Sequence, residues 1–249
     1  MWADSRDALA DLELSARERV LDVGCGTGEL TRVLREESPA EVVGLDADRS
    51  LLASAGSPRL RGDALSLPVA DDSFDLVVCQ ALLVNLPDPA AAVAEFARVS
   101  TELVAVVEPN NAAVSVTSSA EPEAALAQRA REIYLQGVST DATLGADAAG
   151  AFESAELTDV TTAQYDHERR IDPPYSERAV EAARRKASGA GLAADRETML
   201  AGDATPEDLD DLREAWRAMG RDVISQMQAE EYHRREVVPF FVTVGTVPE

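Results

Sequence analysis

Three glycines at alternate positions, Gly24, Gly26 and Gly28, follow a short apolar stretch and precede a sequence of helical character. Glycine tolerates positive φ and carries no side chain, so such a loop can present its backbone N–H groups to a ligand at a helix N-terminus. The pattern therefore predicts a strand, loop and helix that together bind a nucleotide-like ligand.

The spacing of the glycines distinguishes two kinds of nucleotide loop. The dinucleotide pattern G-x-G-x-x-G/A needs a small residue where this chain has Glu29, and its ligand carries a pyrophosphate. Here an acid, Asp22, lies two positions before the first glycine. A carboxylate suits a ligand with a cationic end and would repel a pyrophosphate. The alternative is that Asp22 satisfies polar groups of the loop itself.

Further strands follow in a regular order. Residues 41–48 form a short apolar strand that ends near Asp46, which could accept both hydroxyls of a ribose, whereas Asp48 is expected to cap the next helix. The apolar run at 73–81 suits a strand that is buried on both faces. Residues 103–110 give a fifth strand that breaks at a proline.

Between Arg19 and Asn110 this order of segments resembles the class I S-adenosylmethionine (SAM)-dependent methyltransferases of the methyltransferase type 11 group. The likeness is greatest to the C-methyltransferases of ubiquinone and menaquinone biosynthesis. It implies an α/β fold with a doubly wound, seven-stranded sheet in the order 3-2-1-4-5-7-6, with strand 7 antiparallel. It also implies SAM as the cofactor and S-adenosylhomocysteine (SAH) as the product.

The resemblance also assigns cofactor contacts. The segment 59–68 is similar to one in which an Asp accepts from the adenine amino group and the next amide meets the ring, which places Asp63 and Ala64 there. The expected cofactor-binding residues are Asp22, Gly24, Cys25, Gly26, Gly28, Asp46, Ala47, Asp63, Ala64, Leu65 and Gln80.

Two features depart from the family pattern. The relatives usually carry a histidine where this chain has Asn85, so no role of that imidazole transfers. They also usually begin with a longer N-terminal helical segment that helps to cover the cofactor, whereas residues 1–18 precede the first strand here. We therefore expect the cover to come from elsewhere in the chain, unless the natural chain begins further upstream.

The C-terminal half is expected to complete one methyltransferase domain over residues 1–249. We expect helices at 121–136, 146–155, 176–190 and 206–232, a sixth strand at 157–165 and the antiparallel seventh strand at 237–247. The helical insertion at 166–236 precedes the last strand. Ligands of open α/β folds bind at the carboxyl edge of the sheet, so we predict that this insertion is a lid over the methyl group and the substrate. A dimerisation arm is the alternative.

The charge is strongly asymmetric, with 46 acidic residues, 23 basic residues and a net charge of −23. This excess is typical of proteins from halophiles, because concentrated salt screens the self-repulsion of an acidic surface. No basic stripe with interleaved aromatic residues occurs, so nucleic-acid binding has no support. The sequence also lacks an apolar run of membrane-spanning length and a basic–apolar leader, which predicts a cytoplasmic protein without membrane insertion.

Methyl transfer from SAM is an in-line displacement that needs mainly alignment, exclusion of water and, for some acceptors, a base. No catalytic residue therefore stands out in the sequence. Candidates near the expected opening are Glu108, Asn110, Tyr134, His167 and His233. The two cysteines, Cys25 and Cys79, have no metal-ligand spacing, so no metal is expected.

The predicted function is thus methyl transfer to a small-molecule acceptor through carbon, oxygen, nitrogen or sulfur. Two alternatives keep the same fold. One is a tRNA or protein methyltransferase, for which a basic patch around the opening is expected. The other is a non-catalytic protein that holds SAM or SAH without turnover. The sequence does not indicate an oligomeric state.

Overall fold

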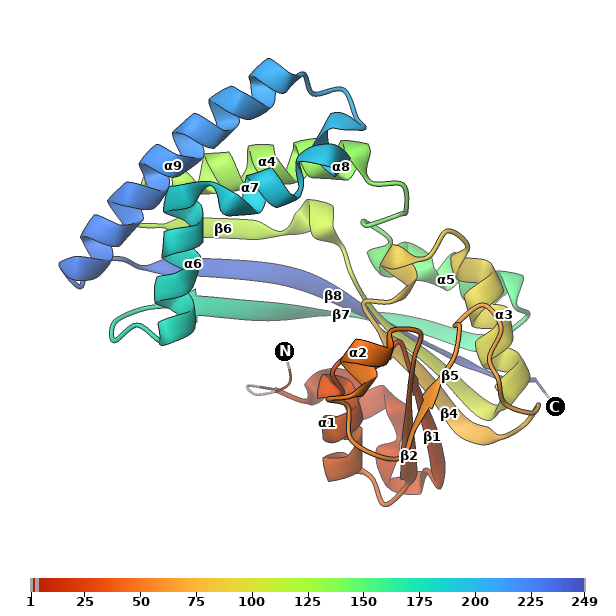
Figure 1. Ribbon diagram of the computed structural model, residues 1–249. Helices are drawn as coiled ribbons and strands as arrows, with labels where there is room; N and C mark the ends of the chain where they lie inside the picture. Colours follow the sequence, from red (N-terminus) through yellow and green to blue (C-terminus); the bar gives the residue numbers. More distant parts are fainter. Residues whose placement is uncertain (1, 3–4, 249) are drawn as a thin grey trace. The chain divides into compact units, whose positions relative to one another are not determined.

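The computed structural model describes residue 2 and residues 5–248, which divide into two compact units (Figure 1). The first unit comprises Met1–Asn110, Thr143–Tyr165 and Pro239–Glu249, and the second comprises Asn111–Ala142 and Asp166–Val238. The second unit thus contains the segment 166–236 that we expected to be an insertion. It also contains residues 111–142, which the sequence had not grouped with it.

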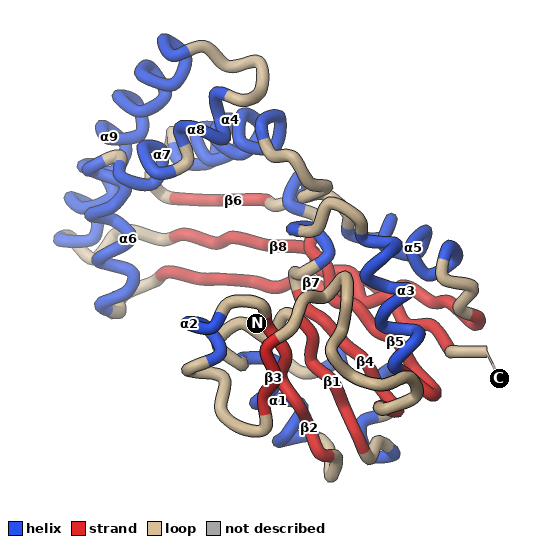
Figure 2. The backbone as a smooth tube through the Cα atoms, turned by 45° about the vertical axis from the view of Figure 1, so that its right-hand side comes forward, coloured by secondary structure: helices blue, strands red, loops and turns tan. Residues whose placement is uncertain are grey.

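The first unit is built on a parallel sheet. Its strands are β1 (Arg19–Val23), β2 (Glu41–Asp46), β3 (Arg59–Arg61), β4 (Phe74–Gln80) and β5 (Ser100–Pro109). They lie side by side in the order β3-β2-β1-β4-β5, as Figure 2 shows. The buried strands read as almost continuous apolar runs because helices cover both faces.

Two long strands complete this sheet. β8 (Arg234–Thr246) is antiparallel to β5, and β7 (Thr158–Ile171) pairs with β8. Because β8 and β7 correspond to the expected strands 7 and 6, the order 3-2-1-4-5-7-6 is confirmed. The expected bounds 157–165 and 237–247 were too short. β7 continues to Ile171 and β8 begins at Arg234, since both strands extend into the second unit.

Helices cover the two faces of the first unit's sheet. They are α1 (Glu29–Glu37), α2 (Arg49–Leu52), α3 (Pro89–Val99) and α5 (Ala149–Ser154), with 3-10 turns η1 (Asp7–Leu12), η2 (Leu14–Ala16), η3 (Leu83–Asn85) and η5 (Gly145–Ala148). On one face Thr31 of α1 contacts Asp22 of β1. On the other face Phe96 of α3 and Phe152 of α5 are fully buried in the main hydrophobic core. Asp48 caps α2 as expected.

The second unit combines a short strand with several helices. Its elements are η4 (Asn111–Ala113), β6 (Ser115–Ser118), α4 (Glu123–Gly137), α6 (Glu177–Ser188), α7 (Ala190–Ala194), α8 (Arg196–Leu200) and α9 (Pro206–Gln228). The sequence did not predict β6, because four half-polar residues carry little strand signal. It forms by antiparallel pairing with β8, with Thr117 opposite Arg235. None of the described helices is both long enough and apolar enough to cross a bilayer.

The helices α6 and α9 approach each other closely. A Cβ on Gly220 of α9 would lie 2.3 Å from the backbone nitrogen of Ala187 in α6, so only glycine allows this contact. Met219 and Val223 of α9 are buried against Ala183 of α6. α9 starts with a capping box in which Thr205 and Asp208 satisfy each other's backbone N–H groups.

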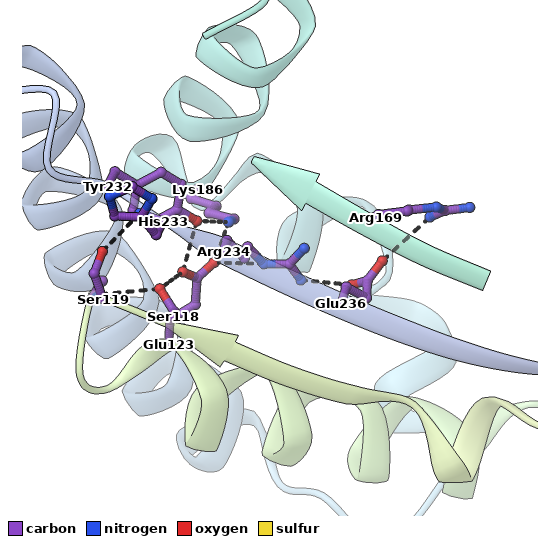
Figure 3. Close-up of polar contacts among 10 residues, drawn as sticks. Ser118, Ser119, Glu123, Arg169, Lys186, Tyr232, His233, Arg234 and Glu236 are labelled. Carbon is purple, nitrogen blue, oxygen red and sulfur yellow. Dashed lines mark hydrogen bonds and ion pairs between the residues drawn. The ribbon is translucent and has the colours of Figure 1, made fainter. Parts of the chain in front are cut away.

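A buried carboxylate lies at the centre of the polar contacts in the second unit (Figure 3). Glu123 of α4 is 1% exposed and forms an ion pair with Lys186 of α6, the only lysine of the chain. The Tyr232 hydroxyl donates to Glu123 Oε2 at 2.8 Å, the Ser118 hydroxyl at 2.6 Å, and Arg234 Nε lies 3.2 Å from Oε1. Burial would raise the pKa of Glu123, but Lys186 and the hydroxyl donors outweigh it, so the pKa lies below its ordinary value.

We expect Glu123→Gln to destabilise the protein strongly, because it leaves the Lys186 ammonium buried without its counter-charge. Removing one partner of a buried pair costs roughly 3–5 kcal/mol. Urea unfolding of the variant measures the loss, with Asp210→Asn as the control. Asp210 pairs with Arg196 at the surface, and an exposed pair contributes at most about 1 kcal/mol. Equal, small losses in both variants would show that the buried pair does not stabilise the unit.

Candidate functional site

The glycine loop lies at the carboxyl end of β1, where it turns into α1. Gly24, Gly26 and Gly28 have φ values of +67°, +54° and +85°, a region that side chains rarely adopt. The loop is tied to the neighbouring strand by two bonds. The Cys25 N–H donates to the Leu45 carbonyl at 2.9 Å, and the Gly26 N–H donates to Asp46 Oδ2 at 2.8 Å. These bonds hold the loop against the end of β2.

The three glycines are required for different reasons. A Cβ on Gly24 would lie 2.7 Å from the Leu82 side chain, and one on Gly28 would lie 2.7 Å from the Ala55 backbone. Around the Cβ position of Gly26, in contrast, no atom lies within 4 Å. Gly24 and Gly28 therefore allow close packing of the chain, whereas Gly26 leaves open space beside a half-buried backbone.

Asp46 ends β2 next to this open space. Its Oδ2 accepts from Gly26, and its Oδ1 accepts the Asp48 N–H at 2.8 Å. Each carboxylate oxygen can accept a further hydrogen bond, so Asp46 retains acceptor capacity. Ala47, the next residue, is exposed. The structure thus brings together Gly26, Asp46 and Ala47, as the sequence predicted for neighbouring residues of one site.

Asp22 lies beneath the loop and not on its surface. Its side chain is 1% exposed, and the Thr31 hydroxyl of α1 donates to its Oδ2 at 2.5 Å. Burial raises the pKa of Asp22 to about 7, against the opposing effect of the hydrogen bonds from Thr31. These contacts join Asp22 to α1, whereas the alternative expected it to satisfy polar groups of the glycine loop, so the role of Asp22 stays a prediction.

The loop that follows β3 carries the residues expected at an adenine ring. Asp63 is exposed and accepts the Leu65 N–H at 3.0 Å, while Ala64 is buried. Two residues of α3 hold the loop in place. The Leu67 N–H donates to Glu95 at 2.8 Å, and Arg98 donates to the Leu67 carbonyl at 3.2 Å. The sequence pointed to the loop but did not identify this support from α3.

The end of β4 holds Gln80 and a tight turn. Gln80 is half-buried, and its Oε1 accepts from the Trp2 indole at 2.8 Å. Below the turn, the fully buried Glu108 accepts the N–H groups of Leu82 at 3.0 Å, Leu83 at 2.9 Å and Val84 at 3.2 Å. Burial raises the pKa of Glu108 to about 7 despite these bonds. Glu108 therefore supports the turn that packs against Gly24.

The other catalytic candidates divide between the two units. Asn110 follows β5 in the first unit, whereas Tyr134, His167 and His233 belong to the second. His233 Nδ1 lies 2.8 Å from Asp172 Oδ1, and Arg169 Nε donates to His167 Nε2 at 3.2 Å. These contacts do not select one of the candidates as a base. In the part of the chain that the structure describes, no group of three or more His, Cys, Asp or Glu could hold a metal ion.

Several residues that shape the site have no sequence signal. Leu82 packs against Gly24, which is distant along the chain. Trp2 meets Gln80 across 78 positions. No spacing rule connects such pairs, because the strand order of the sheet brings them together. Cys25 and Cys79 are buried and unbridged.

The buried acids generate a pH prediction. A carboxyl whose pKa is raised on folding is favoured in its protonated form, so its contribution to stability is complete below about pH 4 and is lost as the pH rises towards 7. We expect the free energy of unfolding of the wild type, relative to Asp22→Asn, to fall between pH 4.5 and 7 by up to about 1.4 kcal/mol per pH unit. Urea unfolding across this range measures it. A constant difference, or one that grows with pH, would contradict the expectation.

Comparison with known proteins agrees with this geometry. Residues 21–102 match a family model described as a methyltransferase domain. Demethylmenaquinone methyltransferase of Lactiplantibacillus plantarum is 38% identical over 107 residues, covering 38% of this chain and 45% of that protein. Trans-aconitate 2-methyltransferase of Deinococcus radiodurans is 43% identical over 96 residues, covering 35% of this chain and 37% of that protein. The chain thus spans less than half of the length of these two relatives.

The fold is also found among solved structures. A crystal structure from Bacillus halodurans C-125, described as that of a methyltransferase, matches with a TM-score of 0.55 and 17% identity, over 97% of both chains. At this identity the likeness concerns the fold alone. The matched segment contains the glycine loop, Asp46, the loop at Asp63 and the end of β4. These residues lie within the segment that is similar to the methyltransferase domain family.

Proposed function

We propose that this protein transfers the methyl group of SAM to a small-molecule acceptor. The observation that carries the proposal is the space beside the half-buried Gly26, where the backbone has a positive φ and no atom beyond the neighbouring residues lies within 4 Å of the missing Cβ. The positive φ favours glycine at this position whatever the space, and the open space in addition leaves room for a ligand to approach the loop.

The residues after β2, β3 and β4 suit SAM. The Asp46 carboxylate retains acceptor capacity at the carboxyl edge of β2, which suits the two hydroxyls of a ribose. The Asp63 side chain is exposed, so it can accept from the adenine amino group, with the Ala64 amide next to it. Gln80 presents an amide at the end of β4. These assignments follow the family pattern residue by residue.

SAM supplies an activated methyl group, so the chain needs to align the reactants and exclude water more than to activate a nucleophile. Asp46 and the glycine loop would hold the nucleoside and amino acid parts. Glu108 would support this task indirectly, by fixing the turn at residues 82–84 that packs under Gly24. No base is assigned by this proposal.

A small molecule is favoured as the acceptor by the relatives. One relative is named as a methyltransferase of demethylmenaquinone and the other as a methyltransferase of trans-aconitate, and both of these acceptors are small molecules. These two relatives do not identify the acceptor of this chain, since their own acceptors differ and the matches cover less than half of their length. The lid or dimerisation role of residues 166–236, the cytoplasmic location and the adaptation to high salt stay predictions.

Calorimetric titration tests the cofactor. We expect SAM and SAH to bind in molar KCl and NAD not to bind. Asp46→Ala should weaken SAH binding at least tenfold, because the variant loses the ribose acceptor and the tie to the Gly26 amide. Absence of SAM and SAH binding to the folded wild type would contradict the proposal. Binding without methyl transfer to any member of an acceptor panel would favour the non-catalytic alternative.

A glycine substitution tests where the ligand lies. Gly26→Ala places a methyl group in the open space and should weaken SAH binding more than tenfold, while the strained φ costs only about 1 kcal/mol of stability. Gly150→Ala is the matched control, because its Cβ also meets no atom within 4 Å, on a helix away from the loop. Unchanged SAH affinity in folded Gly26→Ala would place the ligand elsewhere.

A further inference from the structure

The helix α4 of the second unit presents two different faces. One face packs against the apolar cluster of α8 and α9 through Leu126, Ala130 and Ile133. A second face carries residues at intervals of three and four positions, which are Ala124, Gln128, Arg131 and Leu135. β6 lies alongside α4 and is the terminal strand of its sheet (Figure 1). The second face of α4 is therefore not used to pack against other helices, and it is directed to the chain that forms β6.

A pocket of about 580 Å³ lies between this second face and residues 112–116, which lead into β6. Its volume falls in the range of small-molecule sites, which is about 300–1,000 Å³. Apolar side chains predominate in its lining, among them Val114, Val116, Ala125 and Leu135. The pocket can therefore hold the apolar body of a small molecule.

Arg131 is the cation in the wall of this pocket. Its Nη1 donates to the Val114 carbonyl at 2.7 Å. A guanidinium has five N–H donors, and within the part of the chain that the structure describes Arg131 makes no other hydrogen bond and no ion pair. The side chain is half-buried, and burial lowers the pKa of Arg131 because the charged form loses solvation. The pocket thus contains a partly desolvated charge without a carboxylate against it.

Other arginines that are shielded from solvent have such a carboxylate. Arg17 pairs with Glu102 at 2.6 Å, and Arg98 pairs with Asp71 at 2.5 Å. A buried or half-buried charge is stabilised by a partner of opposite sign, because solvation no longer balances it. At Arg131 the side of the guanidinium that faces the pocket can take this partner from a ligand.

The neighbouring charges leave this place open. Glu132 also lines the pocket, but its Oε1 accepts from Gln128 Nε2 at 2.8 Å. Glu236 and Arg234 of β8 act on the charge of Arg131 with opposite signs. The pocket therefore combines one guanidinium with an apolar lining, an arrangement that suits a ligand with one acidic end and an apolar body.

We propose that this pocket binds an amphipathic organic acid, with its carboxylate on Arg131 and its apolar body against Val114, Val116 and Leu135. Guanidinium and carboxylate match in charge and in the geometry of their paired hydrogen bonds. The inference goes beyond the proposed function and does not depend on it, because the pocket lies within the second unit and no contact with SAM enters the argument.

Calorimetric titration of the whole protein with three eight-carbon probes tests the ligand class. The probes are octanoate, the neutral octanamide and octylammonium. A chain with a net charge of −23 attracts cations and repels anions, so a general surface effect would favour octylammonium. We expect octanoate to bind to one site, at least tenfold more tightly than either of the other probes. Absence of octanoate binding, or equal or tighter binding of octanamide or octylammonium, would overturn the inference.

Substitutions locate the bound octanoate. Arg131→Gln removes the charge and should weaken octanoate binding at least tenfold, while the affinity for octanamide stays within twofold of the wild type. Arg129→Gln is the matched control, because Arg129 lies on the same helix, is exposed and pairs with Asp208 at 3.8 Å outside the pocket. Ala125→Leu fills the pocket from an exposed position, so it should weaken octanoate binding and tests the site independently if Arg131→Gln does not fold.

Unchanged octanoate affinity in folded Arg131→Gln or in Ala125→Leu would place the probe elsewhere and overturn the inference. Failure of the wild type to bind SAM and SAH would contradict the proposed function alone, since octanoate binding does not require the cofactor.

Discussion

The close approach of the backbone at Gly24 and Gly28 is the constraint on which the first unit depends. The loop after β1 passes between the Leu82 side chain on one side and the Ala55 backbone on the other, with 2.7 Å to each from where a Cβ would be. Only a chain without side chains at these two positions can turn there from strand to helix. Between them lies Gly26, whose N–H group donates to Asp46 and whose missing Cβ faces open space. Packing and ligand approach thus use different glycines of one short motif.

Two buried carboxyl groups support this region from below. Asp22 ties β1 to α1 through Thr31, and Glu108 ties β5 to the turn after β4 through three backbone N–H groups. Burial raises the pKa of both groups to about 7. Buried polar groups are usually hydrogen-bonded. Here the two carboxyl groups accept from donors that make no bond to a neighbouring strand. Both acids resemble ligand-binding residues in the sequence, but their contacts are with the protein.

The second unit relies on a different kind of interior. Glu123 and Lys186 form a buried ion pair to which Tyr232, Ser118 and Arg234 add contacts, beside an apolar cluster from α6 and α9. Replacing both partners of such a pair by apolar groups changes the free energy of unfolding little, whereas removing only one partner lowers it strongly. The pair with its contacts joins β6, α4, α6 and the start of β8, which are far apart in the sequence. A chain with one lysine among 23 basic residues places that lysine at this point.

The sequence by itself determined the glycine loop, the place of Asp46 and several strands of the first unit, because these depend on local patterns: apolar runs, glycine spacing and an acid at a strand end. The strand order was an expectation from the resemblance to the class I methyltransferases. The sequence also predicted most helices within a few residues. Tertiary structure alone decided that Asp22 and Glu108 are buried supports, since burial depends on which helix covers each face. It also decided that residues 111–142 join the second unit, that β6 forms by pairing with β8, and that Trp2 reaches Gln80. Each of these depends on contacts between distant positions, and no local pattern in the chain encodes them.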